Sequence, residues 1–232
     1  MSGSVTGFDD WLNRMLEQCA READEGVATY VARAVASQMV ADIRMNDSGA
    51  IDELMRHLAE CRVLTGSDMP SVASEITNAD RLKALHATGL LDSEPEEAYD
   101  RITRAAASAL DVPFALVSLV DIDRQYFKSA AGLTVDTPQE RETPLERSLC
   151  QYAVASGTTL ILDDARFDPV YKNHPAVADG TVVAYLGVPL IDAKGNAVGT
   201  LCVFDTKPRI WGTGHVRTLT DLAQLAVDRM FS

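Results

Sequence analysis

The sequence predicts an α+β domain preceded by an N-terminal α-helical region. In residues 1–64, apolar residues recur at spacings of three and four, which is the period of an amphipathic helix. From residue 78 to 232, short apolar runs bounded by turn-forming residues alternate with amphipathic stretches, a pattern typical of mixed strands and helices. The segment 65–77 between them is small and polar, with Gly66 and Pro70, and is predicted to be a linker.

The N-terminal region contains three amphipathic stretches, at residues 8–19, 27–39 and 51–61. Asp9 or Asp10 is placed to cap the first helix. Three helices in so short a region are near the lower limit for independent stability. We therefore expect their apolar stripes to be buried on the rest of the chain, on a second copy or on a partner. Two interpretations stay open: a helical cap without a role of its own, and a partner-binding module.

Local signals predict the elements of residues 78–232. Asn78 is placed to cap a short helix that ends at Gly89, and Ser93 and Glu96 have the spacing of a capping box for the next helix. The nearly continuous apolar run 114–120 predicts a strand that is buried on both faces. The remaining expected elements are a strand at 125–130, a helix at 148–155, a strand at 158–162, a hairpin of 182–191 and 197–205, and an amphipathic helix from Val216 to Met230.

The charge of the chain disfavours several classes of protein. It carries 21 Lys and Arg against 34 Asp and Glu, a net charge of −13, which would repel nucleic acid and anionic membranes. No apolar run approaches the ~20 residues of a membrane helix. The first residues have neither the basic nor the apolar part of a secretory signal. We therefore expect a cytoplasmic protein with neither nucleic acid nor membrane as a partner.

The cysteines and histidines are dispersed along the sequence. Cys19, Cys61, Cys150 and Cys202 include no Cys-x-x-Cys pair, and the four histidines are equally far apart. A structural zinc site usually has two ligands close together in sequence, so no metal site is predicted. In a reducing cytoplasm we expect free, buried thiols rather than disulfides.

Several stretches of residues 78–232, taken in order, resemble the GAF domain, a sensory module of signalling proteins. They are Arg81–Leu85 through Leu90–Pro95, Val117–Asp121 with Arg124–Ser129, Ser148–Ala153, Asp163–Pro169, and Gly187–Leu190 with Gly199–Asp205. The resemblance implies a central antiparallel sheet with helices on both faces and a homodimer formed through the terminal helices. It also implies a small-molecule pocket on the opposite side of the sheet, but fold alone does not define function. Residues 1–70 carry no such resemblance.

Three chemistries found in GAF proteins are compared with this sequence. The signature of Asn, Lys, Phe, Asp and Glu in members that bind cyclic nucleotides is absent. Cys150 is followed by Gln151 rather than by the His expected beside a bilin-attachment cysteine. In members that reduce free methionine sulfoxide, Cys150 matches the resolving cysteine, but Ala178 stands at the position of the attacking cysteine. Because that mechanism needs the thiolate nucleophile, the comparison argues against this activity.

We therefore expect a non-catalytic sensory or regulatory protein that binds a small molecule or a protein partner. Its signal would leave through its helices or its dimer interface, with the N-terminal helices as a surface for a protein partner. The alternative is a thiol-dependent enzyme or redox sensor that uses Cys150. The sequence identifies no cofactor.

The resemblance places a ligand pocket between the sheet and the loops 132–147 and 163–182. Its expected lining residues are Cys150, Tyr171, Tyr185 and Cys202, and its expected ligand is a small planar or apolar molecule rather than a phosphate-rich one. A structural interpretation stays open beside this one, in which both cysteines and both tyrosines are packing residues. His174 is expected to be an exposed loop residue.

Overall fold

The computed structural model describes residues 9–22, 27, 30–31, 34–35, 72–135 and 137–231. The chain divides into two compact units, residues 1–68 and 69–232, and each is described by itself. In the first unit, helix α1 (Asp10–Glu22) begins where the sequence predicts, because Asp9 Oδ1 accepts a hydrogen bond from Leu12 N at 2.8 Å. Trp11, Leu12 and Met15 of α1 are exposed. The predicted helix at 51–61 lies outside the described residues.

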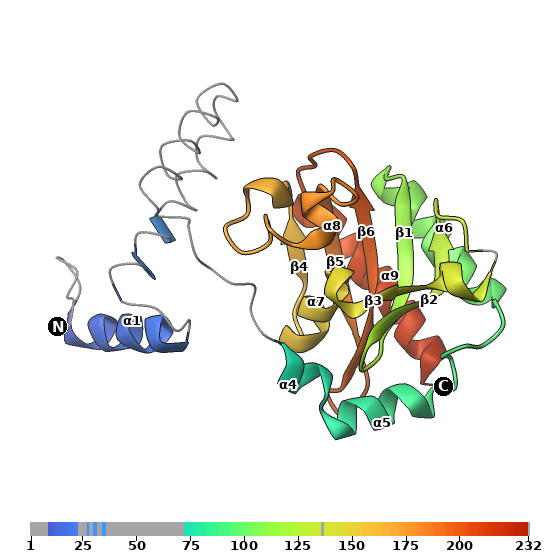
Figure 1. Cartoon of the computed structure of the whole chain (residues 1–232), viewed down its shortest axis with the longest axis horizontal. Helices are drawn as coiled ribbons and strands as arrows, with labels where there is room; N and C mark the ends of the chain where they lie inside the picture. The colour runs from blue at the N-terminus through green and yellow to red at the C-terminus, as the bar shows by residue number, and fades with distance from the viewer. Residues whose placement is uncertain are drawn as a thin grey trace. The chain divides into compact units, whose positions relative to one another are not determined.

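The second unit is built on a six-stranded antiparallel sheet with the order β3-β2-β1-β6-β5-β4. Figure 1 shows β5, β6 and β1 side by side in this sheet. The strands are β1 (Phe114–Val120), β2 (Arg124–Ala131), β3 (Glu142–Pro144), β4 (Leu160–Leu162), β5 (Ala184–Ile191) and β6 (Ala197–Asp205). This arrangement confirms the predicted central antiparallel sheet. The short edge strand β3 lies in a segment for which the sequence predicts no strand, because three polar or proline-containing positions carry no strand pattern.

Helices cover both faces of this sheet. They are α4 (Ala73–Ile76), α5 (Ala79–Ala87), α6 (Glu97–Leu110), α7 (Cys150–Ser156), α8 (Pro175–Ala178) and α9 (Thr213–Met230), with short 3-10 turns at Pro138–Arg141, Leu145–Arg147 and Ala165–Phe167. One core lies between the sheet and α5, α6 and α9, and a second core lies between the sheet and α4, α7 and α8. We call the face of the sheet that α4, α7 and α8 cover the α7 side of the sheet.

Alternate residues of the central strands contribute to the two cores, as the two-residue period of a strand requires. On β6, Leu201 and Val203 belong to the core under α5, α6 and α9, whereas Cys202 and Phe204 belong to the core on the α7 side. Every position of β6 is buried, so both faces of the central strands are covered. Residues that point to the α7 side are therefore the ones available to a site there.

The cap predicted at Asn78 is confirmed, whereas the capping box predicted at Ser93 is wrong. Asn78 Oδ1 accepts hydrogen bonds from two backbone amides at the start of α5. At the start of α6, Glu96 makes no side-chain cap. Ser93 Oγ instead accepts a hydrogen bond from Lys128 Nζ at 2.6 Å. The Lys128 side chain is fully buried, and a buried ammonium group requires acceptors within the protein.

A linker is expected at residues 65–77, but the last part of this segment belongs to the folded domain. Helix α4 lies within it, and Ile76 is buried in the core on the α7 side. The buried Arg81 holds this helix in place, since its Nε and Nη2 atoms donate to Ile76 O at 3.0 and 2.6 Å. Its Nη1 atom donates to Val120 O at 2.7 Å, which ties α4 and α5 to the end of β1. Residues 65–71 lie outside the described residues.

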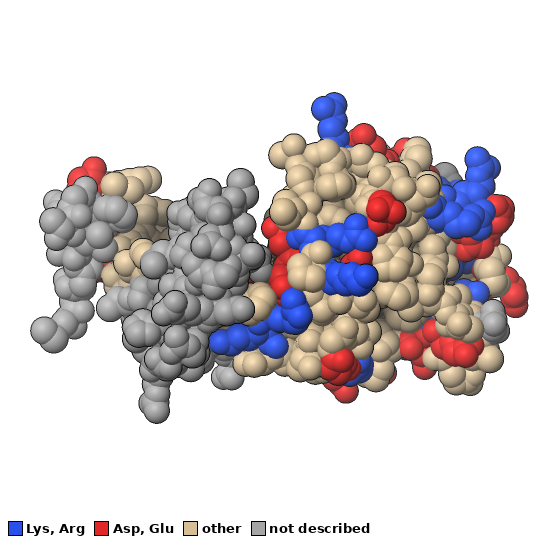
Figure 2. Space-filling view, turned by 90° about the horizontal axis from the view of Figure 1, so that it is seen from above, with Lys and Arg blue, Asp and Glu red and all other residues tan. Residues whose placement is uncertain are grey.

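The surface of the described residues carries charges of both signs. On the face in Figure 2, Lys and Arg side chains are interspersed with Asp and Glu and with uncharged residues. A polyanion approaching this face therefore meets both attraction and repulsion. Within the part of the chain that the structure describes, no helix combines the length and the apolar character that a membrane span requires.

Candidate functional site

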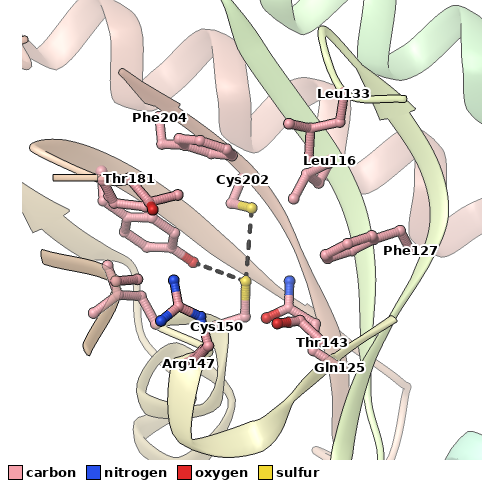
Figure 3. Close-up of a pocket in the computed structure, with 14 residues that line it drawn as sticks. Leu116, Gln125, Phe127, Leu133, Thr143, Arg147, Cys150, Thr181, Cys202 and Phe204 are labelled. Carbon is pink, nitrogen blue, oxygen red and sulfur yellow. Dashed lines mark hydrogen bonds between the residues drawn. The ribbon is translucent and has the colours of Figure 1, made fainter. Parts of the chain in front are cut away.

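A cavity of about 170 Å³ lies on the α7 side of the sheet (Figure 3). Three of the four predicted site residues line it: Cys150, Tyr185 and Cys202. The other lining residues are Leu116, Gln125, Phe127, Leu133, Thr143, Arg147, Leu149, Ala176, Thr181, Val182 and Phe204. The wall is mostly apolar with a few polar groups, which is the usual composition of a small-molecule site.

Strand alternation explains why residues far apart in sequence meet at this cavity. Leu116 of β1 and Cys202 of β6 are direct partners across the sheet, and Cys202 is also the partner of Gly187 on β5. Because side chains two residues apart share a face, Phe204 lies beside Cys202 and Tyr185 lies beside Gly187. The floor of the cavity is therefore built from three adjacent strands.

Cys150 reaches this floor from the first residue of α7. Its Sγ atom lies 3.6 Å from Cys202 Sγ and accepts a hydrogen bond from the Tyr185 hydroxyl at 3.3 Å. Figure 3 shows the two sulfur atoms pointing toward each other. Gln151, the residue after Cys150, fixes the start of α7, because its Nε2 atom donates to Leu145 O at 2.7 Å and to Ser148 O at 3.0 Å.

The environment of the two thiols separates their pKa values. Burial opposes a charge on Cys150, but the hydrogen bonds that its sulfur accepts, led by that from Cys202, outweigh burial and lower its pKa. The pKa of Cys202 is raised because its hydrogen is engaged with the Cys150 sulfur and because it is buried. Burial and the nearby Cys150 charge raise the pKa of Tyr185, so this hydroxyl stays a donor. Cys150 is thus the thiol of the pair that ionises first.

Four polar side chains contribute to the cavity lining: Gln125, Thr143, Arg147 and Thr181. Gln125 on β2 is the strand partner of Thr143 on β3, and its amide donates to Ser118 Oγ at 2.8 Å. Arg147 pairs with Asp179, whose pKa is held well below its ordinary value by hydrogen bonds from Thr181 and from Arg147. Asp179 therefore stays ionised and neutralises the arginine. The cavity offers hydrogen bonds without a strong net positive charge.

Tyr171 does not line the cavity. Its ring packs edge-on against Tyr152 on α7, with 5.1 Å between the ring centroids. Burial raises its pKa to about 12. This tyrosine is therefore a packing residue in the core on the α7 side, and it is the one predicted site residue that the structure separates from the other three.

His174 is fully buried, so the expectation of an exposed loop residue is wrong. Its Nδ1 atom accepts a hydrogen bond from Ala176 N at 3.3 Å and caps the short helix α8. Burial and the nearby Arg147 charge lower its pKa to about 4, so the imidazole is neutral near pH 7. The local sequence shows no strand or helix period that would reveal this burial.

Some lining residues follow from sequence signals and others do not. Gln125 and Phe127 are two residues apart on a predicted strand, so strand alternation places them on one face. Arg147 and Thr181 lie in long polar segments without periodicity, and no sequence signal marks them. Among the described residues, no group of three or more His, Cys, Asp or Glu side chains is arranged to hold a metal ion. The ionisable side chains that line this cavity are the two thiols, Tyr185 and Arg147.

Comparison with known proteins identifies a family and one relative that matches over part of its length. The family model of the GAF domain matches residues 94–228, which is more than half of the chain. A cyclic di-GMP phosphodiesterase of Pseudomonas aeruginosa is 36% identical over 122 residues. The match covers 52% of this chain and 20% of the relative, so the chain spans about a fifth of the length of that enzyme.

Solved structures give weaker similarities. The GAF domain of a phosphoenolpyruvate-protein phosphotransferase from Coxiella burnetii aligns with a TM-score of 0.48 and 18% identity, covering 64% of this chain and 92% of that domain. The free methionine-R-sulfoxide reductase of Neisseria meningitidis, solved with its substrate, aligns with a TM-score of 0.47 and 18% identity. That alignment covers 71% of this chain and 92% of the reductase.

Proposed function

Because the chain belongs to the GAF domain family, we propose that it is a non-catalytic sensory or regulatory protein. In this proposal a small molecule bound in the cavity is the input, and the signal leaves through the helices or a dimer interface. The observation that carries the proposal is that Cys150, Tyr185 and Cys202 border one cavity of about 170 Å³. Family membership supports a sensory role, and the cavity supports a ligand.

The size of the cavity limits the ligand class. An apolar cavity of about 150 Å³ accommodates benzene, and drug-sized ligands occupy roughly 300–1,000 Å³. A volume near 170 Å³ therefore suits a planar or apolar molecule of about one ring. Cyclic di-GMP, named for the Pseudomonas relative, has two guanine rings and two phosphates and is too large. The match covers a fifth of that enzyme, and its named substrate is not proposed as the ligand of this cavity.

The polar lining residues limit which polar groups the ligand would carry. Gln125, Thr143 and Thr181 offer donors and acceptors, and Arg147 offers a cation already neutralised by Asp179. A single amide, hydroxyl or carboxylate would satisfy these groups. The phenyl and aliphatic side chains of the lining would contact the apolar body of the ligand.

A matched pair of substitutions on α8 tests the ligand site. Ala176 is buried at the cavity wall, whereas Ala178 on the same short helix is exposed. Native mass spectrometry of protein purified from its own host should show a retained small molecule in wild type and in Ala178→Leu. The adduct should be lost in Ala176→Leu, because leucine fills the space. An adduct that persists in Ala176→Leu contradicts the assignment, and so does wild-type protein that carries no adduct and is not stabilised by benzoate or indole in thermal-shift assays.

The non-catalytic part of the proposal has its own test. The position of the attacking cysteine in methionine sulfoxide reductases of this family is Ala178 here, an exposed residue at the end of α8. Purified protein supplied with free methionine sulfoxide and a thiol reductant should therefore show no turnover above background. Turnover that disappears in Cys150→Ser would instead support the thiol-dependent enzyme.

We further propose that the protein is a homodimer and that α1 is a surface for a protein partner. Leu225 on α9 is 55% exposed, and Trp11 on α1 is 60% exposed. Exposed apolar side chains on amphipathic helices favour association. These surfaces would let a change at the cavity reach a second molecule.

A further inference from the structure

Two buried thiols lie in van der Waals contact at the floor of the cavity. Cys150 Sγ and Cys202 Sγ are 3.6 Å apart, although the two residues are 52 positions apart in sequence and belong to a helix and a central strand. Both are free thiols in the structure. A disulfide has an S–S bond of about 2.05 Å, so each sulfur needs to move by less than an ångström toward the other.

The two thiols are chemically unequal. Cys150 Sγ accepts a hydrogen bond from the Tyr185 hydroxyl and lies within hydrogen-bond distance of Cys202 Sγ, and these contacts favour its thiolate, whereas the pKa of Cys202 is raised. A thiolate is the form that reacts with oxidants. The pair therefore has the two parts that disulfide formation requires: a nucleophile and an adjacent resolving thiol.

The cavity gives a small oxidant access to both sulfurs. Each residue is almost fully buried, yet both side chains belong to the wall of the same 170 Å³ space. Hydrogen peroxide is close to water in size, so this space accommodates it. A larger oxidant such as a folded protein disulfide would be excluded.

We propose that Cys150 and Cys202 form a peroxide-sensitive dithiol, which oxidation converts into an intramolecular disulfide between α7 and β6. The Cys150 thiolate attacks one peroxide oxygen, the O–O bond breaks, and hydroxide leaves and takes up a proton to give water. The product is a sulfenic acid on Cys150. The Cys202 thiol gives up its proton and attacks that sulfur, the S–O bond breaks, and a second water leaves. Two thiols and one peroxide thus yield one disulfide and two waters, and a thiol reductant reverses the change.

The disulfide would connect an element that borders the cavity to the centre of the sheet. It would replace the contact between the two thiols with a covalent bond and remove the ionisable group of Cys150. Both changes occur at the cavity floor, so the oxidation state of the pair would alter the site itself. This inference does not depend on the cavity holding a ligand.

The test uses the full chain with Cys19→Ser and Cys61→Ser, so that only the two thiols of interest remain. After treatment with hydrogen peroxide, the protein is denatured and its free thiols are counted, and peptides are mapped by mass spectrometry. We expect the loss of both thiols together, a peptide linking Cys150 to Cys202, and full recovery of both thiols with dithiothreitol. Two thiols that survive peroxide, or a disulfide that forms only between two molecules, would overturn the proposal.

Two sets of variants define the order of the reaction and the route of entry. In the same background, Cys202→Ala should leave a sulfenic acid on Cys150 that reacts with dimedone, and Cys150→Ala should leave Cys202 unoxidised at the same dose. Ala176→Leu should slow disulfide formation several-fold, whereas Ala178→Leu should not. Dimedone labelling of Cys202 in Cys150→Ala, or equal rates for the two α8 variants, would contradict the assigned roles. The thiol count in the Cys19→Ser and Cys61→Ser background tests the disulfide even where one of these further variants fails to fold.

Discussion

The Tyr185 ring occupies the space that a side chain at Gly187, two residues further along β5, would require. A Cβ atom at position 187 would lie 2.3 Å from the Tyr185 hydroxyl oxygen and 2.7 Å from two ring carbons. The tyrosine can therefore lie flat against its own strand only because residue 187 has no side chain. This packing directs the hydroxyl to Cys150 Sγ.

Gly187→Ala should displace Tyr185 and disturb the cavity floor. Overpacking of a core typically costs about 1–3 kcal/mol, so we expect a loss of this size in the free energy of unfolding measured in urea. Loss of the hydroxyl donor should also raise the pKa of the Cys150 thiol, which alkylation rates across pH would report. Gly214→Ala is the control, because nothing lies within 4 Å of a Cβ there. Equal stability of both variants would contradict this account.

The elements with strong periodicity could be predicted, including the sheet that carries the site. The apolar runs of β1, β5 and β6 are typical of strands, since both faces of these strands are buried and nearly every position is apolar. Cys202 and Tyr185 follow from alternation on those strands. Their meeting with Cys150 required the family resemblance, because residue spacing alone does not bring α7 to β6.

The predictions that the structure contradicts concern residues in segments without strand or helix periodicity. Tyr171 and His174 lie in the long polar connection 163–182, where side chain burial depends on tertiary contacts with α7 and α8. A histidine between Asn and Pro has the composition of an exposed turn, yet its ring is fully buried and packs edge-on against Tyr152. In the same way, Ser93 matched a capping box, but it is an acceptor for the buried Lys128.

The buried Lys128 predicts a pH-dependent contribution to stability. Its Nζ atom lies 2.9 Å from Glu96 Oε1, and this hydrogen bond is the main cause that lowers the pKa of Glu96. A carboxyl group whose pKa is lower in the folded state stabilises the protein above its unfolded pKa, about 4.3. That stabilisation is lost as the pH falls through the folded pKa.

Glu96→Gln should therefore lower the free energy of unfolding near pH 7 by about 1–2 kcal/mol, after discounting for partial solvent exposure of Glu96. The difference from wild type should shrink below about pH 4. Urea denaturation near pH 7 and below about pH 4 measures the difference in the free energy of unfolding between the variant and wild type. Glu97→Gln is the control, since the ion pair of Glu97 with Arg104 is exposed and should contribute less than about 0.5 kcal/mol. A Glu96→Gln deficit that is unchanged in acid would refute the linkage.

Arg81→Lys should loosen α4 from the domain. A lysine cannot reproduce the fork of hydrogen bonds that Arg81 donates to Ile76 O and Val120 O. Leaving buried carbonyl groups unpaired costs about 1–3 kcal/mol. Hydrogen exchange should therefore become faster in residues 73–77, while β6 keeps its protection. Lys83→Met on the exposed face of α5 is the control. Unchanged exchange in α4 would show that packing of Ile76 alone holds the helix.

The exposed face of α9 predicts the assembly state. Leu225 is 55% exposed on a helix whose opposite face is buried against the sheet. Full burial of an exposed leucine contributes about 1.5–3 kcal/mol, so burial of the exposed part of Leu225 in an interface would contribute about half of that. Wild-type protein at micromolar concentration should sediment as a dimer, and Leu225→Asp should shift it toward the monomer because a carboxylate would be desolvated there. Gln224→Glu, on an adjacent exposed position, should remain dimeric. A single monomer boundary for wild type at all concentrations would exclude the homodimer.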